Sequence, residues 1–336
     1  MLKLCKQLLK APKCIEIWGE EKLKIIFSRK NKKMENKRKI KIKKLILILI
    51  LISILAIGLK MILNYENKIE LCQLKDNGSS QMMGYIITTK NKKTIVIDGG
   101  TDKDTQNLIE QIKQRTGKVD YWFITHPHKD HATCFINIVQ NTDIKIENVY
   151  VTLNEIDWYK QYEPQRTIEA ENLQKVLQNE KIKDKVTEVK LNQEINIDNI
   201  RCKILGIKNP EITTNAINNS SMVIKMQVNN KTILFLGDTG KESSEKLIKE
   251  QPQKELKADI VQMAHHGQNG ATEELYKIIN PKICLWPTPQ WLWDNNSGSG
   301  EDSGNWKTKE TRKWIENLKV KQNIIEKDGN KTIKIW

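Results

Sequence analysis

The hydrophobic positions follow two different patterns along the chain. Between positions 45 and 63 they form one run, LILILILISILAIGLKMIL, whose single charge is Lys60. After position 66 they fall into short apolar segments that are separated by polar turns and by amphipathic segments. The first pattern is typical of a membrane helix, and the second is typical of a folded domain that combines strands and helices.

The pattern after residue 66 predicts strands that alternate with helices. A first group of strands is expected at 69–74, 83–88, 93–98 and 121–124, a second at 186–191, 200–207, 221–228 and 232–236, and two more at 259–264 and 282–286. Helices are expected at 102–116, 166–178, 241–250, 271–279 and 307–318, and a hairpin around Asp328-Gly329-Asn330. Such interleaving predicts an α/β domain over residues 66–336, in which a sandwich of two sheets is covered by helices.

The apolar run is long enough to cross a membrane. Its nineteen residues would span about 28 Å as an α-helix, close to the thickness of the hydrocarbon core. A buried core helix is the alternative, but such helices seldom continue this far without polar residues. We therefore expect a transmembrane anchor at 45–63, in contact with the lipid bilayer.

Positive charge is concentrated before this run. The net charge is +15, of which +12 lies in residues 1–44 and only about +3 in the other 292 residues. The basic stretch 37–44, KRKIKIKK, directly precedes the apolar run, and such a flank stays in the cytoplasm under the positive-inside rule. We expect a basic cytoplasmic segment at 1–44, one crossing of the cell membrane, and a domain at 66–336 outside the cytoplasm. The near-neutral charge of that domain does not by itself indicate a nucleic-acid groove.

Two alternatives concern the N-terminal region. Cleavage as a signal peptide after Ala56-Ile57-Gly58 is possible, but the apolar run continues past this point and Lys60 can extend its amine to the membrane surface. A retained anchor is therefore favoured. Met34 opens a stretch with a start, a basic flank and an apolar run, so translation that begins there would leave 1–33 untranslated.

The cysteines indicate neither a zinc knuckle nor a disulfide framework, because they are scattered and form no C-x-x-C pair. They are Cys5, Cys14, Cys72, Cys134, Cys202 and Cys284. The last four would lie outside the cell, where a disulfide is allowed.

All five histidines of the chain lie in two short segments, and each segment follows an apolar strand. They are His126, His128, His131, His265 and His266. Because side chains at the carboxyl ends of strands can converge on one crevice, the two segments predict a shared site. Either segment alone has an ordinary interpretation, as a loop or a surface metal patch, and it is the combination that favours a metal centre.

The spacing of the first segment suits two metal ions. His126 and His128, two residues apart in an extended turn, project to the same side and can hold one ion. Asp130 and His131 open the next helix and point differently, so they can hold a second ion close by. Asp130 is also expected to orient the attacking hydroxide.

A shared carboxylate and a further ligand come from the later segments. Two ions about 3.5 to 4 Å apart need a bridging group, and Asp238, in Phe235-Leu236-Gly237-Asp238-Thr239-Gly240, is the candidate. One of His265 and His266 would complete the second site, and the other would donate a hydrogen bond or a proton to the substrate. Asp98, after its own strand, is expected to support the ligands through hydrogen bonds. Because every histidine has a metal-related place, the sequence argues against a covalent Ser/His/Asp mechanism.

These motifs resemble the metallo-β-lactamase superfamily, which has HxHxDH (here 126–131), Gly237-Asp238 and Ala264-His265-His266-Gly267 in this order. Within it, the stretches 218–223 (NNSSMV), 234–238 (LFLGD) and 258–261 (ADIV) resemble the hydrolase domain of ComEC-type competence DNA-uptake proteins and their stand-alone relatives. The resemblance covers about residues 66–336. It implies an αββα fold, a di-metal site and hydrolysis by a metal-activated hydroxide, but no particular substrate.

One departure from the family concerns the first metal site. Many members supply a further histidine between the first cluster and the bridging aspartate, and this chain has none from 132 to 264. The first site would then hold His126, His128 and Asp238, with an oxygen ligand from Asn218 or Asn219 or from water. Zinc is the expected ion, manganese is the alternative, and occupancy by one or two ions stays open.

A tryptophan-rich segment near the C-terminal end is a candidate for substrate contacts. Trp286, Trp291, Trp293 and Trp306 lie within 21 residues, around a polar, glycine-containing stretch. Trp291 and Trp293 are the expected substrate contacts, able to stack a base, a sugar or a choline head group. Trp286 and Trp306 are the expected packing residues, and ordinary packing of the whole segment is the alternative.

Together these patterns predict a membrane-anchored metallo-hydrolase that acts outside the cytoplasm. A phosphodiester is the preferred substrate, either in nucleic acid or in a cell-envelope polymer. Hydrolysis of a β-lactam or another small amide or ester is one alternative. A surface binding module that keeps the fold without turnover is another, and the missing histidine keeps it open.

Overall fold

The computed structural model describes residues 11–66, 68–78 and 80–335. The chain divides into two compact units, Met1–Asn64 and Tyr65–Trp336.

The first unit is built on one long helix, α2 (Ala11–Glu66). Its Lys22–Met61 part contains an apolar window with a mean hydropathy of 2.6, none of which is buried against protein. The expected apolar helix at 45–63 is therefore present, and by length and composition it is able to cross a membrane. The helix begins earlier than the apolar run, so the basic residues from Lys13 to Lys44 are helical as well. Residues 1–10 of the expected basic segment lie outside the described residues.

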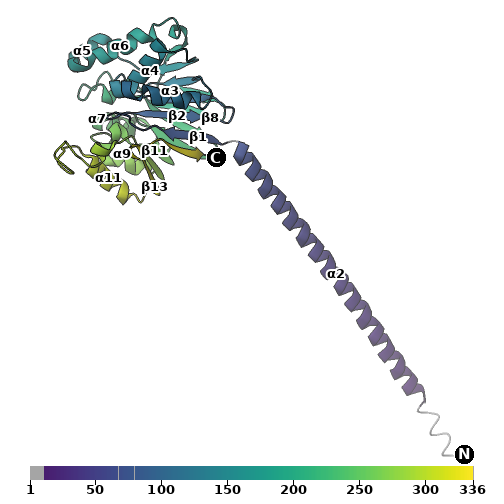
Figure 1. The fold of residues 1–336 in the computed structure, drawn as a ribbon. Coiled ribbons are helices and arrows are strands. Elements are labelled where there is room, and N and C mark those ends of the chain that lie inside the picture. Colours follow the sequence, from purple (N-terminus) through teal and green to yellow (C-terminus); the bar gives the residue numbers. More distant parts are fainter. Residues whose placement is uncertain (1–10, 67, 79, 336) are drawn as a thin grey trace, which may run out of the picture. The chain divides into compact units, whose positions relative to one another are not determined.

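The second unit contains two seven-stranded sheets (Figure 1). The first sheet has the order β14-β1-β2-β3-β4-β5-β6, and the second has the order β13-β12-β11-β10-β9-β8-β7. The strands of the first sheet are β1 (Ile69–Gln73), β2 (Gly84–Thr88), β3 (Thr94–Asp98), β4 (Tyr121–Phe123), β5 (Val149–Val151), β6 (Val186–Glu188) and β14 (Lys331–Ile335). Those of the second are β7 (Glu194–Ile197), β8 (Ile200–Gly206), β9 (Val223–Val228), β10 (Lys231–Phe235), β11 (Ile260–Gln262), β12 (Ile283–Trp286) and β13 (Gln322–Ile325).

Helices cover the outer faces of both sheets (Figure 1). Those over the first sheet are α3 (Thr105–Lys113), α4 (Lys129–Asn141), α5 (Ile156–Tyr162) and α6 (Thr167–Leu177). Those on the side of the second sheet are α7 (Lys241–Glu250), α8 (Gln253–Leu256), α9 (Glu273–Ile279), α10 (Gln290–Trp293) and α11 (Thr308–Asn317). Three hydrophobic clusters separate the four layers: one between the sheets and one under each helical layer. The predicted αββα sandwich is confirmed.

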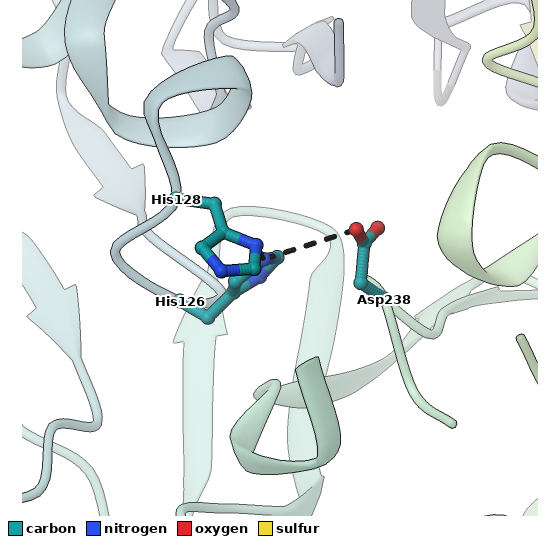
Figure 2. Close-up of side chains that lie close together, drawn as sticks. All are labelled: His126, His128 and Asp238. Carbon is teal, nitrogen blue, oxygen red and sulfur yellow. Dashed lines mark hydrogen bonds and ion pairs between the residues drawn. The ribbon is translucent and has the colours of Figure 1, made fainter. Parts of the chain in front are cut away.

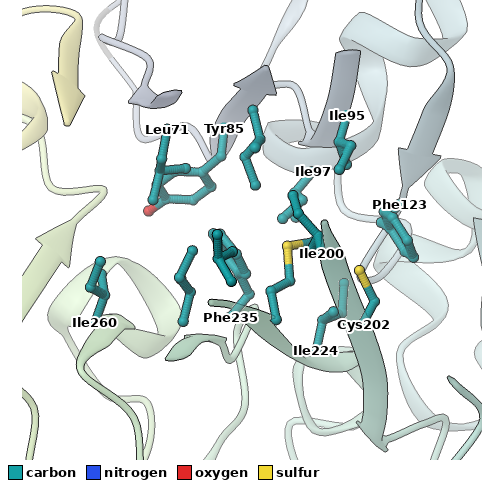
Figure 3. Close-up of a cluster of buried hydrophobic side chains, with 14 of the residues drawn as sticks. Leu71, Tyr85, Ile95, Ile97, Phe123, Ile200, Cys202, Ile224, Phe235 and Ile260 are labelled. Carbon is teal, nitrogen blue, oxygen red and sulfur yellow. The ribbon is translucent and has the colours of Figure 1, made fainter. Parts of the chain in front are cut away.

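The alternation of side chains along each strand explains why the central strands are apolar at nearly every position. In β2, Tyr85 and Ile87 belong to the cluster between the sheets, whereas Ile86 belongs to the cluster under the helices. Figure 3 shows the inter-sheet cluster, in which the ring centroids of Tyr85 and Phe235 lie 5.2 Å apart. A strand that is buried on both faces has no solvent side, so it reads as a continuous apolar run.

Two sequence-based assignments of strands were wrong. The strand expected at 186–191 is β6, which pairs with β5 at the edge of the first sheet and does not belong to the second group. The strands on either side of Asp328-Gly329-Asn330 do not form a hairpin, because β13 pairs with β12 in the second sheet and β14 pairs with β1 in the first. Local turn residues report that the chain turns, but the partner of each strand is chosen by tertiary packing.

Both sheets change from antiparallel to parallel pairing at one strand. In the first sheet this strand is β3, which is antiparallel to β2 and parallel to β4. In the second it is β10, which is antiparallel to β9 and parallel to β11. Ligands of α/β sheets bind in the crevice outside the carboxyl ends of the strands. The carboxyl ends of β3, β4, β10 and β11 carry the motifs predicted from the sequence.

Candidate metal centre

The first histidine segment begins in the loop after β4, continues into the first turn of α4 and is held by Asp98. Asp98, at the end of β3, has a φ of 54° and is fully buried. Its Oδ1 accepts the Thr125 N–H at 2.8 Å, and its Oδ2 accepts the Thr125 hydroxyl at 2.8 Å and faces His131 Nδ1 at 2.9 Å. A single carboxylate therefore sets both the start of the loop and the orientation of one imidazole.

Asp238 follows β10 on a turn that a glutamine holds. Gln262 Oε1 accepts the N–H groups of Leu236 and Gly237, each at 2.7 Å, and its Nε2 donates to Gly237 O at 2.9 Å. Gly237 has a φ of 55°, and a Cβ there would lie 3.0 Å from Ser221. Asp238 N–H donates to Ser221 Oγ at 3.0 Å. The side chain of Asp238, buried to 1% exposure, is thereby directed toward the histidines.

Two consecutive left-handed residues follow β11. His265 has φ 50° and His266 has φ 55°, a conformation that is rare outside glycine and is typical of functional sites. The His265 N–H donates to Gly237 O at 3.1 Å, which ties this turn to the one that carries Asp238. Gly267 continues the turn with φ 77°, and a Cβ there would lie 2.5 Å from the Trp286 ring.

The first ligand group consists of His126, His128 and Asp238, whose ligand atoms all lie within 4.8 Å of one another. His126 Nε2 lies 3.1 Å from His128 Nδ1 and 3.8 Å from Asp238 Oδ2. Figure 2 shows the carboxylate facing the two imidazoles from the opposite side of the site. This geometry brings together two nitrogen atoms and one oxygen atom from two distant segments of the chain.

The second ligand group consists of Asp130, His131 and His266, whose ligand atoms also lie within 4.8 Å of one another. His266 Nε2 lies 3.4 Å from Asp130 Oδ2 and 3.6 Å from Asp238 Oδ2. His131 Nε2 lies 3.3 Å from Asp238 Oδ1. Asp238 therefore contacts both groups, one oxygen facing His131 and the other facing His126 and His266.

The donor atoms of these residues fit divalent metal ions. Buried polar atoms in proteins are nearly always hydrogen-bonded, yet His131 Nε2, His266 Nε2 and Asp238 Oδ1 are buried without a hydrogen-bond partner among the described residues. The opposite nitrogen of each imidazole is engaged: His131 Nδ1 faces Asp98, and His266 Nδ1 donates to Pro287 O at 2.9 Å. Such contacts leave the Nε2 lone pair of both rings free for a cation.

The charges of the site are strongly coupled. Burial alone would lower the pKa of His131, but the carboxylates of Asp238 and Asp98 outweigh it and raise the pKa well above its usual range. Burial would raise the pKa of Asp238, but the surrounding histidines hold it well below its usual range. The pKa of His126 is lowered by burial and by its histidine neighbours. The group as a whole attracts positive charge, either protons or metal ions.

The structure distinguishes between the two neighbouring histidines, which the sequence could not. His266 is fully buried and belongs to the second ligand group. His265 lies at the rim with a side chain that is 17% exposed; its Nε2 is 3.9 Å from Asp238 Oδ2 and 3.3 Å from Asn218 Nδ2.

The structure also distinguishes between the two candidate asparagines by the hydrogen bonds of their side-chain oxygens. Asn219 Oδ1 accepts the N–H groups of Gly240 and Ser243, each at 3.1 Å, and the Ser243 hydroxyl at 2.7 Å. These bonds occupy its oxygen. Asn218 Nδ2 donates to Asn215 Oδ1 at 3.0 Å, whereas its own Oδ1 is buried without a hydrogen-bond partner.

Sequence reasoning missed three polar residues beside the site. Glu163 Oε2 lies 3.8 Å from His128 Nε2. Gln81 Nε2 donates to Asp130 Oδ2 at 3.0 Å, and Gln268 Nε2 donates to Gln81 Oε1 at 2.8 Å. Gln268 is only two residues from His266, and this short separation was a signal that could have identified it. Glu163 and Gln81 lie in polar segments with no motif, and only the fold brings them to the histidines.

The tryptophans form two pairs. The rings of Trp286 and Trp293 have centroids 5.4 Å apart, and the Arg312 guanidinium lies 4.2 Å from the Trp293 ring centroid. The centroids of Trp291 and Trp306 are 4.9 Å apart. Trp293 thus packs on the buried Trp286, while Trp291 and Trp306 border the loop from 294 to 305. A substrate contact of Trp291 or Trp293 stays a prediction.

The chain is similar to several known proteins. ComE operon protein 3 of Bacillus subtilis is 29% identical over 101 residues, which are 30% of this chain and 12% of that protein. The chain therefore corresponds to a small part of that relative. The metallo-β-lactamase fold protein YhfI of Bacillus subtilis is similar over 80% of this chain and 100% of its own, with 12% identity and a TM-score of 0.49. CmlA, a diiron β-hydroxylase from Streptomyces venezuelae, is similar over 80% of this chain and 54% of its own, with 10% identity and a TM-score of 0.48.

The family profile that matches the chain spans both ligand groups. It is the profile of the metallo-beta-lactamase superfamily, and it covers residues 83–283, from β2 to the start of β12. Both histidine segments and Asp238 fall inside this range. The chain belongs to the metallo-β-lactamase superfamily.

Proposed function

We propose that this superfamily member is a membrane-anchored phosphodiesterase that uses two divalent metal ions outside the cytoplasm. The observation that carries the proposal is the convergence of two ligand groups on one carboxylate, Asp238. Two adjacent cations can stabilise both the attacking and the leaving oxygen of a phosphodiester, which is the common use of paired metal sites.

The first position would be held by His126, His128 and Asp238, with Asn218 Oδ1 in the place of the missing histidine. The second would be held by Asp130, His131 and His266, with Asp238 shared. Four imidazoles favour zinc, and the carboxylate and amide oxygens also allow manganese. Ions bound there would supply a water molecule of lowered pKa and positive charge near the developing oxyanion.

The remaining residues would position groups and move protons. Asp130 would orient the attacking water, and it is itself held by Gln81. His265, exposed at the rim beside Asn218, would donate a proton to the leaving oxygen. Asp98 and Asn219 would hold the loops that carry the ligands. Trp291, paired with Trp306, would stack against a ring of the substrate, with Trp293 as a second candidate.

The substrate would be nucleic acid or a phosphodiester of the cell envelope. The resemblance of the stretches 218–223, 234–238 and 258–261 to ComEC-type DNA-uptake proteins supports nucleic acid. The small net charge beyond residue 44 counts modestly against a long DNA groove, because such grooves neutralise many phosphates. A short strand, which has few phosphates, fits that charge better.

Membrane attachment would come from the 45–63 part of α2. Its apolar length and the basic residues before it support a single crossing with the hydrolase domain outside. Protease treatment of intact cells without a cell wall tests this orientation: the domain should be digested and the basic segment protected. Protection of the domain in intact cells would contradict it.

Activity is tested with the full chain in detergent. Bound metals are quantified, and bis-p-nitrophenyl phosphate, single-stranded DNA and nitrocefin are offered with Zn²⁺ or Mn²⁺. We expect turnover of the first two substrates, and its loss in His128→Ala and Asp238→Ala but not in Asp157→Asn, whose side chain is 94% exposed. Turnover of nitrocefin alone would favour a small-amide hydrolase, and bound metal without any turnover would favour a binding module.

A further inference from the structure

The contacts of His128 differ on the two sides of its ring. On one side, Nδ1 lies 3.1 Å from His126 Nε2, within the first ligand group. On the other side, Nε2 is buried and has no hydrogen-bond partner. The charged atom that faces this nitrogen is Glu163 Oε2, at 3.8 Å.

Glu163 also contacts the turn that carries Asn218. It lies between α5 and the short helical turn Pro164–Arg166, and its side chain is 13% exposed. Its Oε1 accepts the N–H of Ile217 at 3.2 Å, and Ile217 precedes the turn Asn218–Ser220. One carboxylate therefore connects His128 with the segment that brings Asn218 to the site.

The second ligand group contains the same arrangement in a tighter form. His131 presents Nε2 to Asp238 while its Nδ1 lies 2.9 Å from Asp98. A carboxylate behind a metal-binding imidazole fixes the tautomer of the ring and makes it a stronger ligand. Loss of such a carboxylate typically lowers metal affinity by roughly 10- to 100-fold. For His128 the residue in the corresponding place is Glu163.

We propose that Glu163 is the positioning residue of the first metal position. Its Oε2, 3.8 Å from His128 Nε2, favours the proton on that nitrogen through its charge, so that the Nδ1 lone pair points at the ion. Its Oε1 holds the turn that carries Asn218. Because this position lacks the histidine that many family members supply, its affinity depends on how well the two remaining imidazoles and the Asn218 oxygen are held. The inference rests on the metal-binding part of the proposed function and not on the substrate.

The position of Glu163 separates this role from that of a direct ligand. Its carboxylate faces Nε2, whereas the first ligand group is assembled on the Nδ1 side of the same ring. A direct ligand would have to lie on the Nδ1 side. Substitution of a positioning residue lowers the affinity for one ion, but it does not change the number of ions that bind at saturation.

The test compares Glu163→Gln and Glu163→Ala with Glu169→Gln in the full chain. Glu169 is a matched control, because it accepts the Lys129 N–H at 2.9 Å and pairs with Arg166 at 2.7 Å beside the same loop. Zn²⁺ is titrated against a chromophoric chelator. We expect every variant to bind two ions at saturation. The affinity for the more weakly bound ion should fall by about 10- to 100-fold in Glu163→Ala and by a smaller factor in Glu163→Gln. In Glu169→Gln it should fall by less than about threefold.

Nuclear magnetic resonance of ¹⁵N-labelled histidine side chains in the zinc-loaded protein gives a second measurement. A protected His128 Nε2–H signal should be present in the natural sequence and in Glu169→Gln, and should shift or exchange rapidly in Glu163→Ala. Unchanged affinity and an unchanged signal would overturn the inference, as would the loss of one ion at saturation, which would make Glu163 a ligand. If the natural protein binds two ions but hydrolyses nothing, the proposed activity fails and the role of Glu163 stands.

Discussion

The two ligand groups share Asp238 but differ in how the protein holds their imidazoles. In the second group, His131 is backed by Asp98 at 2.9 Å and His266 by Pro287 O at 2.9 Å, and both side chains are fully buried. In the first group, His126 Nδ1 faces the hydroxyls of Thr125 and Ser221 at 3.1 and 3.3 Å, and His128 faces Glu163 at 3.8 Å. The imidazoles of the second group are therefore held by closer contacts than those of the first group.

Preorganisation has a direct consequence for metal affinity. A ligand whose orientation is already set loses little conformational freedom on binding, so more of the interaction energy is retained as affinity. The second position should fill first and release its ion last. The first position should be the one whose occupancy responds to metal concentration and to changes in the surrounding residues.

The largest effect is expected from Asp238→Ala, because it removes the carboxylate that both groups share. We expect hydrolysis to fall by roughly 10³-fold or more and both zinc affinities to decrease. The measurements are kcat/KM on bis-p-nitrophenyl phosphate and zinc titration. A change in only one of the two zinc affinities would show that Asp238 belongs to one ligand group and is not shared.

His128→Ala and His266→Ala should separate the two groups. His128→Ala removes a ligand of the loosely held group, so the weaker zinc step should fall by more than about 100-fold, which exceeds the loss typical of an outer partner. The tighter step should persist. His266→Ala should instead lower the affinity for the more tightly bound zinc ion. The opposite result for the two variants would contradict the prediction that the second position binds its ion more tightly.

The pH dependence of stability provides a smaller test in metal-free protein. The pKa values of His131 and His266 are raised, burial being outweighed by Asp238 and neighbouring carboxylates. Their stabilisation is complete below about pH 6.5, the ordinary value for an unfolded chain, and is lost as pH rises through the raised values. The lowered pKa of Asp238 adds stabilisation that is present above about pH 4 and is lost as pH falls.

The metal-free protein, kept in a chelator, should therefore lose stability and show a falling Tm as the pH rises above about 6.5. The zinc-loaded protein should become more stable over the same range, because the ligands must be deprotonated to bind. Thermal unfolding followed by circular dichroism gives both curves. Parallel curves with and without metal would indicate that these histidines are not ligands.

The smallest effects are expected in the tryptophan segment, which packs behind the second group through Trp286. Trp293→Ala removes packing on Trp286 and Arg312 and should destabilise the protein by roughly 1–3 kcal/mol. Trp291→Ala should raise KM a few-fold and leave kcat nearly unchanged, if it stacks on substrate. If Trp291→Ala and Trp293→Ala lowered stability equally and neither changed KM, both tryptophans would be packing residues.

Much of the candidate site followed from residue types at strand ends. Asp98, His126 and Asp238 were expected because each follows an apolar segment, and the structure brings all three into one buried cluster. The hairpin at Asp328-Gly329-Asn330 was wrong, since its flanking strands pair with different sheets. Local patterns report periodicity and turns, and they do not report which strand becomes the neighbour.

The sequence by itself determined the apolar helix, the strand-and-helix alternation and the set of metal-binding residue types, because each depends on neighbours within a few positions. Only the tertiary structure decided that His266 and not His265 enters the second ligand group, and that the oxygen of Asn219 is used up while that of Asn218 is free. Only the tertiary structure brought Glu163 to His128, across 35 positions of sequence. Such choices depend on the direction of a side chain after distant segments have packed, and no local pattern contains that information.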